Sequence, residues 1–177
     1  MKVSTAVLSL ITIALSTQFP VIAAPQQGSQ TQSTVSQQEI LFSQAELDQM
    51  LAPIALYPDT VLSHVLIAAT YPLEIVKATR WLSTQPGMTS EQALKAAENE
   101  PWDPSVRALV AFPPLLTKLN NELEWTQKLG DAFLSQEADV MATVQRLREK
   151  AYAAGNLQNQ EHIVVERKEK AIIIEPR

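Results

Sequence analysis

The chain has 177 residues and a formal net charge of −5 at pH 7, and this length suits a single domain. Its hydrophobic content of 46% and charged content of 19% are typical of a folding chain rather than a disordered tail. The absence of cysteine excludes disulfides, thiol catalysis, cysteine-ligated metal and a lipid anchor on an N-terminal cysteine. No cluster of lysines and arginines resembles a nucleic-acid-binding patch, so nucleic acid is not an expected partner.

Residues 1–23 have the three-part pattern of a secretory signal peptide. Lys2 gives a positive start, an uncharged apolar run extends from Val3 to Leu15, and small or apolar residues precede an expected cleavage site after Ala23. The run of about 13 residues is shorter than the roughly 20 of a membrane-spanning helix, which disfavours an uncleaved anchor. We therefore expect an exported protein of the periplasm or outer cell envelope, with no transmembrane span in the mature chain.

The mature chain is expected to have three parts. Residues 24–42 predict a flexible Gln/Ser/Thr-rich spacer, because so polar a stretch cannot bury enough surface to offset its ordering. Residues 43–156 carry apolar residues at helical spacing and predict a compact bundle of six or seven short helices. Residues 157–177 contain two β-branched runs, 163–165 and 171–174, which predict two short strands. The predicted fold class is mainly α with a small C-terminal two-stranded β element.

Capping residues and prolines mark the expected helix starts. Asp59 and Asp103 are predicted N-caps, and Pro104 follows Asp103 at a first helical position. The last helical region, from about 122 to 154, is expected to break near Gly130 or Ser135. Two capping boxes are predicted, at Ser43 with Glu46 and at Thr89 with Gln92.

Three helix joints place an aromatic residue directly before a proline, at Tyr57-Pro58, Tyr71-Pro72 and Phe112-Pro113. Proline disfavours helical geometry in the residue before it, so a helix tends to end there. The simpler interpretation is that the rings reinforce three corners. The alternative is that Tyr57 and Tyr71 line a shared groove with Trp102, because Tyr and Trp suit binding surfaces. Trp81 and Trp125 fall within helical patterns and are expected to be core residues.

A series of short motifs resembles the bacterial domain-of-unknown-function 3300 family from about Gln44 to Pro176. The resemblance implies an exported envelope protein and no established activity. Many members continue beyond the tail into a segment rich in Tyr-Val-Pro, whereas the residues here end at Pro176-Arg177. The motifs are LAPIALYPD (51–59), AATYP (68–72), RW (80–81), WDPSVRAL (102–109), FP (112–113), LGDAF (129–133), DVM (139–141) and VQRLREKA (144–151).

Three carboxylates near these joints, Asp59, Glu74 and Asp103, are the candidate catalytic residues. A pair about 5 to 10 Å apart could hydrolyse a glycan such as peptidoglycan. Capping and the first helical turn account for all three without chemistry. The two histidines, His64 and His162, show no metal-ligand spacing, so neither a metal nor another cofactor is predicted.

The predicted strands require a partner surface, because an isolated two-stranded hairpin is marginal in water. Their apolar face can pack on the helices, or an edge can pair with another chain. We expect a loose hairpin that serves as an interaction edge, through Ile163, Val165, Ile172 and Ile174. The leading hypothesis is therefore a non-catalytic binding or scaffolding module that meets an envelope protein or a second copy. The alternative is a cell-wall hydrolase.

Mass spectrometry of the exported protein is expected to show an N-terminus at Ala24, or within a few residues of it, because the signal pattern ends there. Protein that keeps Met1 and stays in the membrane would contradict this prediction.

Overall fold

A computed structural model describes residues 41–159, 161–169 and 171–177. The predicted signal peptide, and the predicted spacer except for Leu41 and Phe42, lie outside these residues. Over the described ranges the chain forms eight helices and two strands. The elements are α1 (Gln44–Leu51), α2 (Asp59–Ala68), α3 (Pro72–Ser83), α4 (Ser90–Ala97), α5 (Pro104–Leu109), α6 (Pro113–Asn121), α7 (Leu123–Ser135), α8 (Glu137–Ala153), β1 (Ile163–Lys168) and β2 (Ala171–Pro176).

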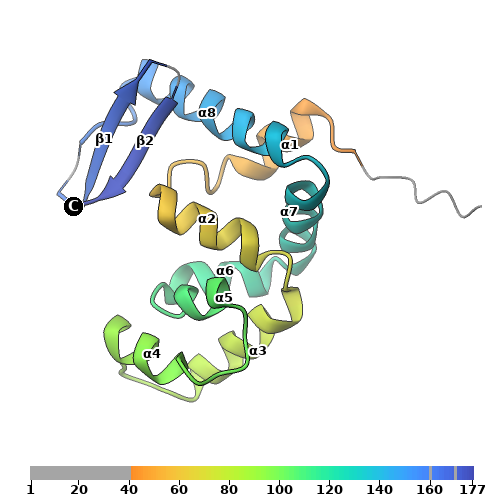
Figure 1. Ribbon diagram of the computed structural model, residues 1–177, viewed down its shortest axis with the longest axis vertical. Helices are drawn as coiled ribbons and strands as arrows, with labels where there is room; N and C mark the ends of the chain where they lie inside the picture. Colours follow the sequence, from red (N-terminus) through yellow and green to blue (C-terminus); the bar gives the residue numbers. More distant parts are fainter. Residues whose placement is uncertain (1–40, 160, 170) are drawn as a thin grey trace, which may run out of the picture. The chain divides into compact units, whose positions relative to one another are not determined.

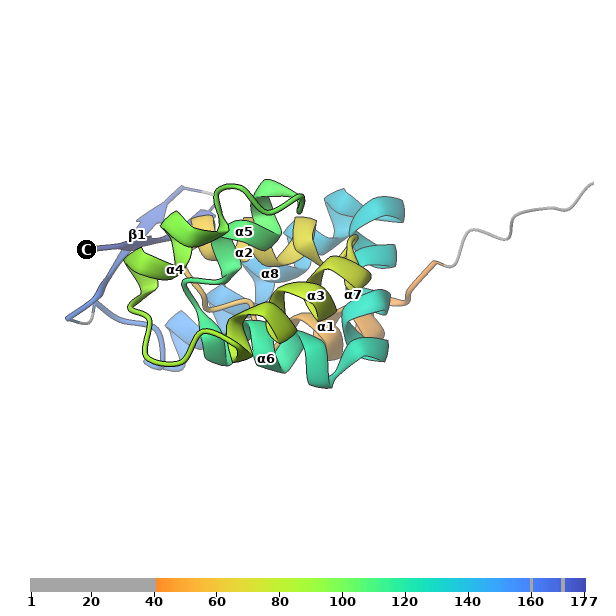
Figure 2. The same ribbon diagram turned by 90° about the horizontal axis from the view of Figure 1, so that it is seen from below.

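The mainly helical prediction with a two-stranded β element is confirmed. Helix α2 lies at the centre and packs against α3, α5, α7 and β2, while α1 and α8 lie side by side (Figure 1). The β-hairpin lies beside one end of α8, and α4 lies at the far end of the helical body (Figures 1 and 2). Among the described residues no single helix is long and apolar enough to cross a membrane. Only α2 and α3 together, bent by 111°, meet that criterion.

The predicted helix starts are largely confirmed. Both capping boxes are present, and Asp103 accepts the backbone N–H of Ser105 at the start of α5. Pro72, Pro104 and Pro113 each occupy the first helical position of a helix, where a missing N–H costs nothing. The helices number eight because the region from 122 to 154 divides at Gln136, next to the expected break at Ser135.

The prediction that Asp59 is an N-cap is wrong. Pro58 holds the cap position without a side-chain hydrogen bond, and Asp59 is the first residue of α2. The carboxylate of Asp59 instead forms an ion pair with Arg148 of α8. Because the guanidinium of Arg148 is charged and buried, it binds this carboxylate more strongly than the backbone N–H groups at the start of α2 do.

Gly130 stays within α7 and does not break it, because its role is close packing. Its backbone faces the α2–α3 corner, where a Cβ would lie 2.7 Å from the carbonyl carbon of Ala69 and 3.0 Å from the backbone nitrogen of Thr70. Only glycine lets the two backbones approach so closely. The LGDAF motif therefore marks a helix-crossing point.

The β-hairpin packs one face onto the helices. Its antiparallel register places Val165 opposite Ile174. Ile172 and Ile174 are buried with Leu157, and the half-buried Ile163 and Val165 pack against them. The expected packing of this apolar face on the helices is observed, while pairing of a strand edge with another chain stays a prediction.

Arg148 connects the hairpin to the rest of the fold. Its side chain is 1% exposed and donates hydrogen bonds to the carbonyl oxygens of Ala55 at 2.7 Å, Tyr57 at 3.0 Å and Ile172 at 2.9 Å. Its remaining observed partner is Asp59. One buried guanidinium thus holds the α1–α2 connection, the start of α2, and strand β2.

Replacing Arg148 by methionine is expected to lower the free energy of unfolding by about 3 to 5 kcal/mol, because carbonyl groups that it serves lose their donor. Urea denaturation followed by circular dichroism measures the change. The matched control is Arg146→Met, which removes a pair with Asp48 in which both side chains are about one-third exposed and should cost less than about 1 kcal/mol. Equal losses in the two variants would contradict the central role of Arg148.

Candidate binding site

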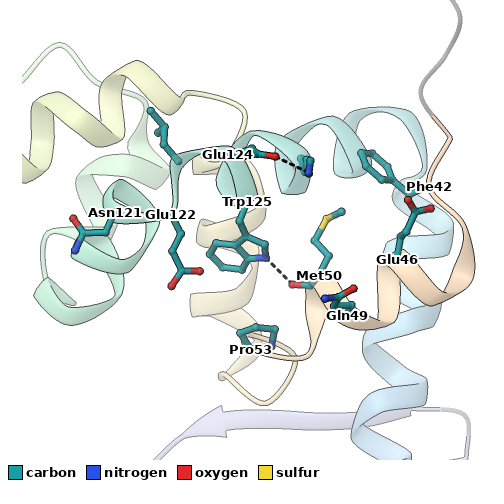
Figure 3. A pocket seen from close by; sticks show the side chains of 11 residues that line it. Phe42, Glu46, Gln49, Met50, Pro53, Asn121, Glu122, Glu124 and Trp125 are labelled. Atoms are coloured by element: carbon teal, nitrogen blue, oxygen red, sulfur yellow. Dashed lines mark hydrogen bonds and ion pairs between the residues drawn. The ribbon is translucent and has the colours of Figure 1, made fainter.

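A pocket lies between α1 and the junction of α6 with α7 (Figure 3). Its volume is about 690 Å³, within the range of pockets that hold small ligands or short peptide segments. Apolar and aromatic side chains form its floor, and polar and acidic side chains surround them. The lining residues are Phe42, Glu46, Gln49, Met50, Pro53, Asn121, Glu122, Leu123, Glu124, Trp125 and Lys128.

Trp125 is the central side chain of this pocket (Figure 3). Helix α7 presents it, and its indole N–H donates to the carbonyl oxygen of Met50, 3.0 Å away on α1. The ammonium of Lys118 lies 5.0 Å from the ring centroid and forms an ion pair of 2.7 Å with Glu122. The indole is therefore held in one orientation, and its ring already stabilises a cation.

Phe42 forms the side of the pocket next to the N-terminal segment. Its backbone N–H donates to the side-chain oxygen of Gln136 at 2.6 Å, and its carbonyl accepts from the side-chain nitrogen of Gln136 at 3.1 Å. Gln136 lies at the break between α7 and α8. The two hydrogen bonds fix the backbone just before α1 and so position the Phe42 ring.

Two of the rim carboxylates, Glu46 and Glu124, have lowered pKa values. Hydrogen bonds from the side chain and backbone of Ser43 lower the pKa of Glu46. A hydrogen bond and the charge of Lys128 lower the pKa of Glu124, and the same contact raises the pKa of Lys128. The lining carries three glutamates and Lys128, and Lys118 lies beside Trp125 and Glu122, so acidic side chains outnumber basic ones by three to two around the apolar floor.

Each of the three candidate catalytic carboxylates contacts a group that helps to hold the fold together. Asp59 pairs with Arg148. Glu74, in the first turn of α3, accepts the backbone N–H of Asp103 at 2.6 Å. Asp103 in turn accepts the backbone N–H of Ser105 at 2.8 Å. Glu74 and Asp103 thus lie next to each other, and each has a role in starting or holding a helix.

The aromatic residues proposed for a shared groove differ in their surroundings. Trp102 is 8% exposed and stacks edge-on against Trp81, with ring centroids 5.6 Å apart. Tyr57 is half-buried against the core, whereas Tyr71 is 41% exposed. None of the three lines the pocket of Trp125.

The four apolar tail residues face the helical body to different degrees. Ile172 and Ile174 are buried, so their side chains belong to the core of the hairpin. Ile163 and Val165 are half-buried on β1. The outward N–H of Val165 donates to the side chain of Asn159 at 2.6 Å, so a side chain covers part of this strand edge.

Sequence reasoning missed the pocket because its residues come from segments that are separate in the chain. Trp125 has helical spacing and was expected to be a core residue; it packs against the core and also lines the pocket. The acidic residues around it read as a solvated helix face. The one available signal was Phe42, a large aromatic residue placed before the first capping box.

Comparison with known proteins confirms the resemblance. A family model described as "Protein of unknown function (DUF3300)" matches residues 43–177. The chain belongs to this family. Its relative YacH from Escherichia coli (strain K12), an uncharacterized protein, is 48% identical over 118 residues, which are 67% of this chain and 19% of YacH. The chain thus spans about a fifth of the length of this relative. No solved structure matches the present chain.

Substitutions of Asp103 distinguish a role in helix capping from a role in acid catalysis. Asp103→Asn is expected to keep the stability of the domain, because Asn and Asp are equivalent N-caps, whereas Asp103→Ala should lose about 0.5 to 2 kcal/mol. Thermal and urea unfolding measure both effects. A glycan-hydrolysing activity that disappears in the folded Asp103→Asn variant would contradict the structural assignment.

Proposed function

We propose that this chain is a non-catalytic binding module of the bacterial cell envelope, and that the pocket around Trp125 holds its partner. The observation that carries the proposal is the combination of an oriented indole, an apolar floor and a rim of acidic side chains in one open pocket. Binding sites commonly pair an apolar surface with a few placed polar groups. Tyr and Trp are also frequent anchors in protein interfaces.

The envelope location rests on the sequence. The signal pattern of residues 1–23 supports export, and the family resemblance implies an exported bacterial protein. The spacer predicted for residues 24–42 leads directly to Phe42, which lines the pocket. A partner in the periplasm or outer envelope is therefore the expected occupant, and a second copy of the chain is the other form that binding can take.

The hydrolase alternative receives less support from the geometry. It needs a general acid and a base or nucleophile that are free to act on a substrate. Asp59 neutralises a buried guanidinium, and Glu74 accepts a backbone N–H at 2.6 Å. Removing either carboxylate would leave a buried or half-buried donor without its partner, which accounts for these residues through folding.

Photo-crosslinking in the native bacterium tests the binding proposal. A crosslinking amino acid at Gln49, on the rim of the pocket, is expected to trap a defined adduct whose mass identifies the partner or a dimer. The matched control places the same amino acid at Glu98, an exposed position at the end of α4. Adducts of equal yield at both positions, or free monomer alone at Gln49, would contradict a partner site at this pocket.

A further inference from the structure

We propose that the occupant of the Trp125 pocket is a basic segment of a partner polypeptide, with an apolar side chain inserted between its cationic residues. This inference rests on the proposed binding function and assigns a chemical class to the ligand. It combines three independent features of the pocket, which are its charge, its aromatic floor and its open, elongated lining.

The charge of the lining favours a cation. Glu46, Glu122 and Glu124 surround the floor; Lys128 is the basic residue among the lining side chains, and Lys118 lies next to them, against Trp125 and Glu122, so the carboxylates remain in excess. Each carboxylate already has a partner, but all three partners are local. Ser43 contacts Glu46, and lysines one turn away contact the other two. Exposed pairs of this kind exchange partners at little cost, so an incoming cation can share these carboxylates.

The aromatic floor favours the same class of ligand. The chain itself places the ammonium of Lys118 5.0 Å from the centroid of the Trp125 ring. Because an indole attracts cations through its electron-rich face, this ring suits a lysine or arginine side chain together with its apolar stem. Met50 and Phe42 lie on the side of Trp125 that leads along α1 (Figure 3) and offer apolar contacts for a neighbouring side chain.

The shape favours a segment of polypeptide. The lining runs from Phe42, before α1, to Asn121, at the end of α6, and the pocket opens to solvent. Amides at Gln49 and Asn121 are present at the two sides and can hydrogen-bond a peptide backbone. The net charge of −5 of the whole chain also draws basic partners toward it.

Titration with synthetic peptides tests the assignment. The probe is a capped nonapeptide with lysines flanking a central Phe-Leu pair, and matched peptides carry glutamine or glutamate in place of lysine. The readout is the ¹⁵N–¹H indole signal of Trp125, assigned by its loss in Trp125→Phe. The lysine peptide should shift this signal, the glutamine peptide should bind more weakly, and the glutamate peptide should not bind.

Charge variants sharpen the test. Glu122→Gln and Glu124→Gln should each lower the affinity for the lysine peptide by about two- to fivefold, the range expected when one exposed ion pair is lost. Higher ionic strength should also weaken it. Glu98→Gln, at the C-cap of α4, is the matched control and should leave the affinity for the lysine peptide unchanged. The basic-segment assignment would be overturned if the glutamine or glutamate peptide bound as tightly as the lysine peptide. It would also be overturned if all three variants bound the lysine peptide as tightly as the unmodified protein does.

Failure of this inference can be distinguished from failure of the binding function. An adduct at Gln49 with a partner whose crosslinked segment is acidic or neutral would keep the binding function and overturn the basic segment. A Trp125 signal that shifts with protein concentration alone would replace the partner with a second copy. No shift with any peptide and no adduct at Gln49 would overturn both.

Discussion

The fold depends on how one buried arginine is satisfied. A guanidinium withdrawn from water is costly unless its charge and its donors find partners. Arg148 finds them in Asp59 and in the carbonyl groups of Ala55, Tyr57 and Ile172. Since these partners come from the α1–α2 connection, α2 and β2, the arginine can be satisfied only when all three are in place. The interaction therefore couples the hairpin to the helical body and specifies how the chain is assembled around α8.

Prolines at helix starts and one close helix crossing determine how the helices pack around α2. Prolines at the first position of α3, α5 and α6 set where these helices begin, and short helices let the chain turn frequently around α2. Gly130 then allows α7 to cross the α2–α3 corner at backbone distance. Such features act locally, but each one limits how the next helix can lie. The result is one continuous apolar core in the helical body, with a small second cluster beneath the hairpin.

Local signals made much of this fold predictable. Capping boxes, prolines after aromatic residues and β-branched runs act over a few residues, and the structure follows them closely. Predictions failed where a distant side chain competed with a local one, as when Arg148 took the carboxylate of Asp59. The pocket could not be predicted for a related reason. Its floor joins Met50 of α1 to Trp125 of α7, and neither segment has a sequence pattern that predicts contact with the other.

The residues that hold the frame and the residues that line the pocket form nearly separate sets. The motifs that carry the family resemblance include Ala55, Asp103, Gly130 and Arg148, whose contacts concern folding. Of the residues lining the pocket, Pro53 lies within the motif LAPIALYPD, Met50 directly precedes that motif, and Lys128 directly precedes LGDAF; the other lining residues lie further from these motifs. A substitution on the pocket rim therefore changes charge or shape at the site without removing a structural hydrogen bond of Arg148. Under the proposed binding function, this separation would let one frame carry different partner preferences through the rim of the pocket.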